Sequence, residues 1–144
     1  MIRTLGRVEI PPAVLEHAET IKRENYKTNT PARFQVRTLA GGQNLICQLA
    51  PLAGHLPENL DFVYFSACRG AEPHTDRLDP NRFHDTTFVV PVILPPGRSV
   101  IEAQGHEVVA EVGAVYEFDH TRTHSMTLED TESGCVVVMV AIKR

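Results

Sequence analysis

The sequence has few cysteines and no spacing that would pair them. Cys47, Cys68 and Cys135 are an odd number, so we expect reduced thiols rather than a disulfide framework. The sequence also lacks a Cys-x-x-Cys pair, a nucleophile elbow and a glycine-rich loop suited to phosphate. A thiol-redox, serine-hydrolase or nucleotide-binding mechanism therefore has no support in the sequence.

Basic residues and long apolar runs are also scarce. The 144 residues include 14 Lys and Arg against 18 Asp and Glu, a net charge of −4. This charge does not indicate nucleic acid as a partner, although a local basic patch could still serve a nucleic-acid substrate. No run approaches the roughly 18 apolar residues of a membrane span, and residues 1–7 lack the apolar core of a signal peptide. We therefore expect one cytoplasmic domain, residues 1–144, without a membrane partner.

Short β-strand patterns follow a single helical pattern. Residues 11–25 predict the one helix, because two prolines suit a first turn and an apolar stripe follows at helical spacing. Turns containing Gly or Pro separate the predicted strands, which are residues 33–39, 45–49, 61–67, 86–94, 99–103, 106–111, 114–118 and 135–142. The pattern is typical of a mainly β fold, a sandwich or a jelly roll. We expect residues 33–144 to form its core, with the helix packed on the sheet.

Two of these strands carry more specific predictions. Pro91 cannot donate a hydrogen bond to a neighbouring strand, so residues 86–94 should form a sheet edge or contain a bulge there. Residues 135–142 are continuously apolar, which predicts a strand buried on both faces.

Two histidine-containing segments carry the candidate chemistry. In His74-Thr75-Asp76, alternation along a strand would put the imidazole and the carboxylate on one side. A histidine from a later strand would complete two His and one carboxylate, the set typical of non-haem Fe(II) oxygenases with open coordination positions. His120 and His124 are both candidates, because positions four apart share a strand face. The alternative is a surface His hydrogen-bonded to a nearby Asp, without a metal.

The second segment carries a family resemblance. Residues 116–126 (YEFDHTRTHSM) resemble the distal motif of Fe(II)/2-oxoglutarate-dependent dioxygenases, and are most similar to the aspartyl/asparaginyl β-hydroxylase and prolyl hydroxylase branches. The resemblance covers about residue 61 to the C-terminus and implies that this part is the core of a double-stranded β-helix, a cupin-like jelly roll. It also implies His74, Asp76 and His124 as the iron ligands. It implies that His120 lies next to the ligands. The alternative, that His120 is a turn residue without a role, stays open.

The same resemblance implies the cofactor and the reaction. It implies Fe(II), with 2-oxoglutarate as a small-molecule cosubstrate and ascorbate supporting the activity of a hydroxylase. The short chain leaves room for few insertions, so we expect an open mouth and a bulky substrate such as a peptide or protein side chain. The identity of the substrate and the oligomeric state stay open.

The sequence departs from this family at the cosubstrate. The family places Arg or Lys about nine or ten residues after the distal His, where it binds the far carboxylate of 2-oxoglutarate. Ser133 and Gly134 occupy those positions. Either the cosubstrate is not 2-oxoglutarate or a cation comes from elsewhere; the candidates are Arg122, Arg98 and, farther from the metal, Lys143 and Arg144.

Two other hypotheses use the same barrel. A cupin would bind a metal without an oxo-acid cosubstrate, as an isomerase, another dioxygenase or a small-molecule sensor. Its usual first motif has two His separated by one residue and then a Glu, which His74-Thr75-Asp76 does not supply. A metal-free jelly-roll binding module would make the three polar residues coincidental.

Overall fold

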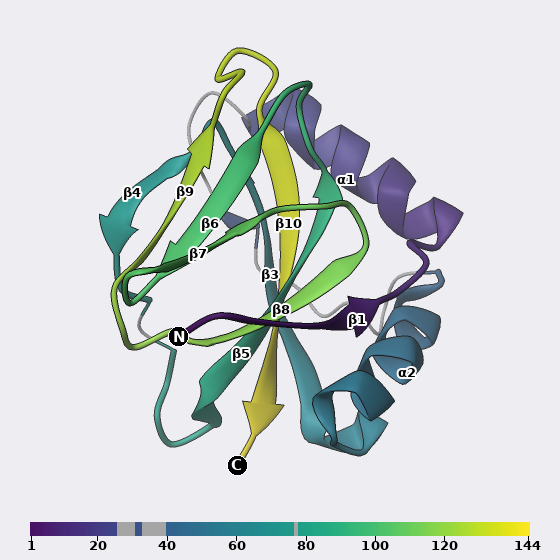
Figure 1. Ribbon diagram of the computed structural model, residues 1–144. Coiled ribbons are helices and arrows are strands. Elements are labelled where there is room, and N and C mark those ends of the chain that lie inside the picture. Colours follow the sequence, from purple (N-terminus) through teal and green to yellow (C-terminus); the bar gives the residue numbers. More distant parts are fainter. Residues whose placement is uncertain (26–30, 33–39, 77) are drawn as a thin grey trace.

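Two antiparallel sheets face each other, and two helices lie on the side of the molecule away from the smaller sheet (Figure 1). This computed structural model describes residues 1–25, 31–32, 40–76 and 78–144. The larger sheet has the order β1-β8-β5-β10-β3-β2 and the smaller sheet the order β4-β9-β6-β7. The strands of the larger sheet, in that order, are Arg3–Arg7, Ala114–Asp119, Phe83–Ile93, Cys135–Lys143, Leu60–Cys68 and Pro31–Ala32. Those of the smaller sheet are Ala71–His74, His124–Leu128, Ser99–Ala103 and His106–Val109.

Strand β10 lies at the centre of the larger sheet, paired with both β5 and β3. Its side chains alternate between two buried surfaces. Val136, Val138 and Val140 are fully buried on the face that α1 contacts, and full burial of a valine contributes about 1.5–3 kcal/mol. Val137 and Met139 point to the space between the sheets, where they line a cavity. The prediction of a strand buried on both faces is therefore confirmed.

Helix α1, Pro12–Asn25, confirms the predicted helix with a start one residue later. Pro12 has no backbone N–H, but the N–H groups of a first turn have no partner within the helix, so proline costs no hydrogen bond there. Val14, Ala18 and Ile21 are buried along one stripe against the larger sheet. No helix among the described residues has the length and apolarity needed to cross a membrane.

The prediction of a strand at residues 45–49 is wrong, because these residues lie inside helix α2, Gly42–Ala53. Leu45, Ile46 and Leu49 are fully buried, and this spacing is helical rather than alternating. Gly41 (φ 78°) and Gly54 (φ 73°) flank the helix in the left-handed conformation, which glycine adopts without strain. A second helix thus interrupts the segment expected to be wholly β, and a 3₁₀ turn, η2 (Pro57–Asn59), follows it.

The remaining strand predictions are confirmed with small shifts of their ends, except residues 33–39, which lie outside the described residues. Pro91 belongs to β5, between β8 and β10, and the register against β10 shifts beside it, between Val136 and Val137. The prediction of a bulge at Pro91 is therefore confirmed, and the alternative prediction of a sheet edge is wrong. Strands β1 and β4 were not predicted. Both are short, and Gly6 in β1 and Pro73 in β4 interrupt the residue pattern that is typical of a strand.

Candidate metal site

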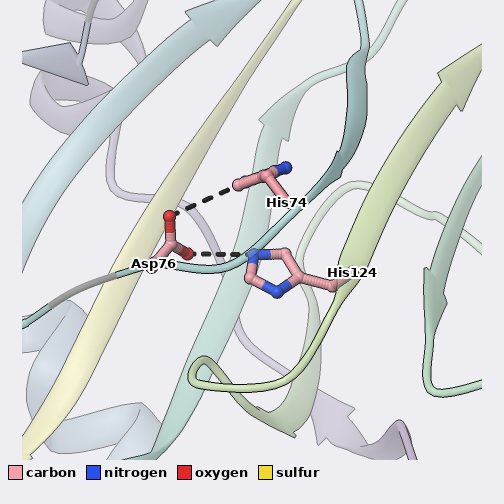
Figure 2. Close-up of side chains that lie close together, drawn as sticks. All are labelled: His74, Asp76 and His124. Atoms are coloured by element: carbon pink, nitrogen blue, oxygen red, sulfur yellow. Dashed lines mark hydrogen bonds and ion pairs between the residues drawn. The ribbon is translucent and has the colours of Figure 1, made fainter.

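The pairing of β4 with β9 brings two histidines together. His74, the last residue of β4, lies opposite His124, the first residue of β9, and directly opposed side chains on neighbouring strands are within contact distance. Asp76 follows two residues after His74, where its backbone N–H donates to the His120 carbonyl at 2.9 Å. This bond holds the chain after β4 against the turn before β9, so that the Asp76 carboxylate lies beside both imidazoles (Figure 2).

One carboxylate oxygen faces each ring. Asp76 Oδ2 lies 2.9 Å from His124 Nε2, and Oδ1 lies 3.6 Å from His74 Nε2. The two imidazole centroids are 4.4 Å apart. The three residues each offer one atom to a metal, and these atoms lie within 4.8 Å of one another.

The other nitrogen of each ring is bound to the backbone. His74 Nδ1 lies 2.7 Å from the Glu72 carbonyl and His124 Nδ1 lies 2.9 Å from the Arg122 carbonyl. A carbonyl oxygen can only accept, so both Nδ1 atoms carry hydrogen. In a neutral ring Nε2 then presents a lone pair to the Asp76 carboxylate. The lone pairs of Nε2 and of the carboxylate oxygen repel each other at this distance unless a positive ion, either a proton or a metal, lies between them.

Burial and hydrogen bonding have opposite effects on the pKa of His124. Burial of the ring lowers the pKa of His124, but the hydrogen bonds to Asp76 and to the Arg122 carbonyl, together with the Asp76 charge, outweigh burial. The pKa of His124 is therefore raised above its ordinary value. In the absence of a metal, a proton serves as the positive ion between the ring and the carboxylate.

The three side chains differ in their exposure to solvent. The exposed side-chain fraction is 8% for His124, 16% for Asp76 and 42% for His74. Phe118, buried in β8, packs against the His124 ring with centroids 4.8 Å apart. His124 is thus held on two sides, whereas His74 lies at the rim of the cluster and is exposed to solvent.

His120 lies behind this cluster rather than in it. The ring is 3% exposed, with Nδ1 3.3 Å from the Asp76 carbonyl and Nε2 3.2 Å from the His84 carbonyl. Both ring nitrogens therefore face backbone oxygens. Asp119 shapes the turn by accepting from the Thr121 N–H and hydroxyl at 2.8 and 2.6 Å. His120 ties the backbone of Asp76 to β5, which is a positioning contact.

A cavity of about 90 Å³ extends inward from the three residues between the two sheets. Most of its lining is apolar: Val89, Ile101, Phe118, Met126, Val137 and Met139. Ser66 and Ser125 add hydroxyl groups, and no Lys or Arg of the described residues lines it. This lining was not predicted from the sequence. Residues 135–142 are apolar on both faces of their strand, so the sequence could not show which of their side chains face the site.

A larger groove of about 830 Å³ lies along β4 and β9. It shares His74, Ser125 and Met126 with the small cavity, and Arg69, Glu72 and Pro73 are among its other lining residues. The rim of the site is therefore open toward a wide surface groove, as the sequence analysis expected of the mouth.

Comparison with known proteins bears on the fold. No family model and no curated protein matches the sequence. The structure is similar to a prolyl-4-hydroxylase of Pseudomonas putida (13% identity, TM-score 0.61, covering 99% of this chain and 92% of that chain). It is also similar to a protein of Neisseria meningitidis (14% identity, TM-score 0.52, covering 93% and 99%). The fold is a cupin-like jelly roll. At these identities the similarity establishes the fold alone, and it confirms the predicted fold class.

The four candidate cosubstrate cations do not line the cavity. Arg122 is exposed in the turn before β9, with Nε 3.9 Å from an Asp119 oxygen. Arg98 is exposed before β6, with Nη2 3.9 Å from a Glu107 oxygen. Arg144 donates to the carbonyls of Pro80 and Phe83, and neither it nor Lys143 lines the cavity. Ser133 and Gly134 lie in the loop before β10.

Proposed function

We propose that this protein is a non-haem Fe(II) oxygenase whose metal ligands are His74, Asp76 and His124. Two imidazoles and one carboxylate are a ligand set that suits Fe(II) and leaves coordination positions open. The residues present fit the metal, because their donor atoms converge within 4.8 Å. His120 is proposed as the residue that positions Asp76.

The observation that carries the proposal is the shared orientation of the two imidazoles. Each donates Nδ1–H to a backbone carbonyl two residues earlier and turns Nε2 toward the same carboxylate. Histidine ligands in metal sites are oriented by such an outer hydrogen bond, which fixes the tautomer. A surface His–Asp pair without a metal has no need for a second histidine arranged in the same way.

The chain's own residues would divide the work. Bound iron would supply the activation of O2. Asp76 would neutralise one positive charge of the metal, while Phe118 and the Arg122 carbonyl restrain the His124 ring. The exposed edge at His74 opens on the groove along β4 and β9, which supports a bulky substrate.

We further propose a hydroxylase that uses a 2-oxo acid as cosubstrate, with 2-oxoglutarate as the acid that the family resemblance implies. The open positions beside a two-His, one-carboxylate set support chelation of such an acid. One observation favours a second candidate, a cupin-type metal protein without this chemistry: no Lys or Arg among the described residues lines the inner cavity.

Anaerobic calorimetric titration with Fe(II) tests the proposal. The wild-type protein should bind one iron, and Asp76→Ala should lose tight binding while remaining folded. Asp85→Ala is the matched control, because Asp85 is an exposed acidic residue outside the cluster. Equal iron stoichiometry in Asp76→Ala and wild type would remove Asp76 from the site and with it the proposal.

A further inference from the structure

Most of the described side chains that line the inner cavity are apolar, and they come from both sheets. Val89, Val137 and Met139 come from the larger sheet, and Ile101 and Met126 from the smaller one. Whatever group extends inward from the metal therefore contacts hydrocarbon and thioether atoms over most of its surface. Such a lining favours an apolar group by removing its surface from water.

Among the described residues, a carboxylate in this cavity would find no lysine or arginine to pair with. The cavity contains the hydroxyls of Ser66 and Ser125, which are neutral. Arg98 and Arg122 lie at the surface beside Glu107 and Asp119. A buried charge is strongly disfavoured unless it is paired and hydrogen-bonded. The described lining therefore does not fit the far carboxylate of 2-oxoglutarate.

The cavity is also small. Its volume is about 90 Å³, whereas pockets for whole ligands span about 300–1,000 Å³. It can accept a few heavy atoms of a ligand whose polar end stays outside, at His74, Asp76 and His124.

We infer that the cosubstrate is a 2-oxo acid with a short uncharged aliphatic tail, such as 2-oxobutyrate or 2-oxoisovalerate. This inference rests on the proposed iron site and replaces the acid that the resemblance implies. The polar end, a carboxylate beside a keto group, faces the metal, and the tail fills the apolar cavity. In the coupled reaction the bond between the first two carbons breaks and CO2 leaves. One atom of O2 enters the new, shorter carboxylate and the other enters the substrate C–H bond.

Binding is measurable without turnover. The anaerobic Fe(II)-loaded protein is titrated separately with 2-oxobutyrate, 2-oxoisovalerate and 2-oxoglutarate, by calorimetry and by the visible charge-transfer band of a chelated oxo acid. The aliphatic acids should bind at least about tenfold more tightly than 2-oxoglutarate, because only the latter buries an unpaired charge. Iron binding is measured first, in the absence of any acid.

A pair of valines on one strand provides a matched test. Val137→Ala enlarges the cavity, and should shift the preference toward a longer tail, 2-oxohexanoate over 2-oxobutyrate, by about tenfold. Val138→Ala removes the same atoms from the next residue, which is fully buried on the opposite face toward α1. It should leave the preference unchanged even though it destabilises the fold.

Each outcome has a separate meaning. Tighter binding of 2-oxoglutarate would overturn the inference and leave the proposed function standing. Iron binding without chelation of any oxo acid would overturn the inference and favour the cupin-type candidate. Absence of iron binding would overturn the proposed function together with the inference. An equal shift in Val137→Ala and Val138→Ala would contradict the assignment of the cavity as the site of the tail.

Discussion

Replacing His120 and His124 separately by alanine should separate a residue that positions the site from one that binds iron. Both rings are buried, 3% and 7% exposed, and both make two polar contacts through their nitrogens. Losing a buried ring and its hydrogen bonds costs about 2–4 kcal/mol of folding free energy in either case. Stability alone therefore does not distinguish the two variants.

Iron affinity should distinguish them. His120 contacts only the backbone of Asp76 and His84 through its ring nitrogens, so His120→Ala should retain iron with affinity reduced about ten- to a hundredfold. His124→Ala removes a proposed ligand and should abolish tight binding. His74→Ala should do the same with a smaller loss of stability, because the His74 side chain is 42% exposed.

The assay is anaerobic Fe(II) calorimetry on each variant, with urea unfolding of the metal-free proteins alongside. His106→Ala, at an exposed histidine of β7, is the control and should match wild type in both measurements. Tight iron binding by His124→Ala together with its loss in His120→Ala would refute the assignment, and would place the metal four residues earlier in the chain.

Three further predictions follow from the geometry. Because the pKa of His124 is raised, a metal must displace a proton there, and iron affinity should rise with pH through the range above the ordinary histidine pKa of ~6.5. The metal-free protein should lose the stability that His124 contributes as pH rises through the same range. Iron affinity and stability that do not depend on pH would contradict this prediction. Phe118→Ala should cost about 3–5 kcal/mol and weaken iron binding by releasing the His124 ring, and unchanged iron affinity would count against that contact. Leu49→Ala, at a fully buried position, should cost about 2–5 kcal/mol in urea unfolding, whereas Leu56→Ala, at a 59% exposed position, should not; equal effects would argue against helix α2.

The sequence predicts those elements whose pattern fits only one structure. Residues 135–142 form an apolar run too long for a half-buried strand, and β10 is buried on both faces. Residues 45–49 are apolar over a window short enough to fit a strand or a helix. Pro51 lies inside the helix, although proline usually interrupts a helix, so it also concealed the helix in the sequence. Local pattern could not decide between these possibilities, because the burial of α2 depends on its packing in the tertiary structure.

The candidate site is predictable in its residues and not in its arrangement. Alternation along a strand places His74 and Asp76 on one side but cannot choose between His120 and His124, because both have the same parity. The register of β4 against β9, which pairs His74 with His124, brings these two histidines together, and register is a long-range property. The apolar cavity depends on both sheets at once, so no single segment of the sequence predicts it.

The most direct measurement is the position of iron in a crystal grown and loaded anaerobically, from anomalous scattering at the iron absorption edge. The proposed ligand set predicts one strong peak in contact with Nε2 of His74, Nε2 of His124 and a carboxylate oxygen of Asp76. A peak at another location, or no peak in protein that has been saturated with Fe(II), would contradict it.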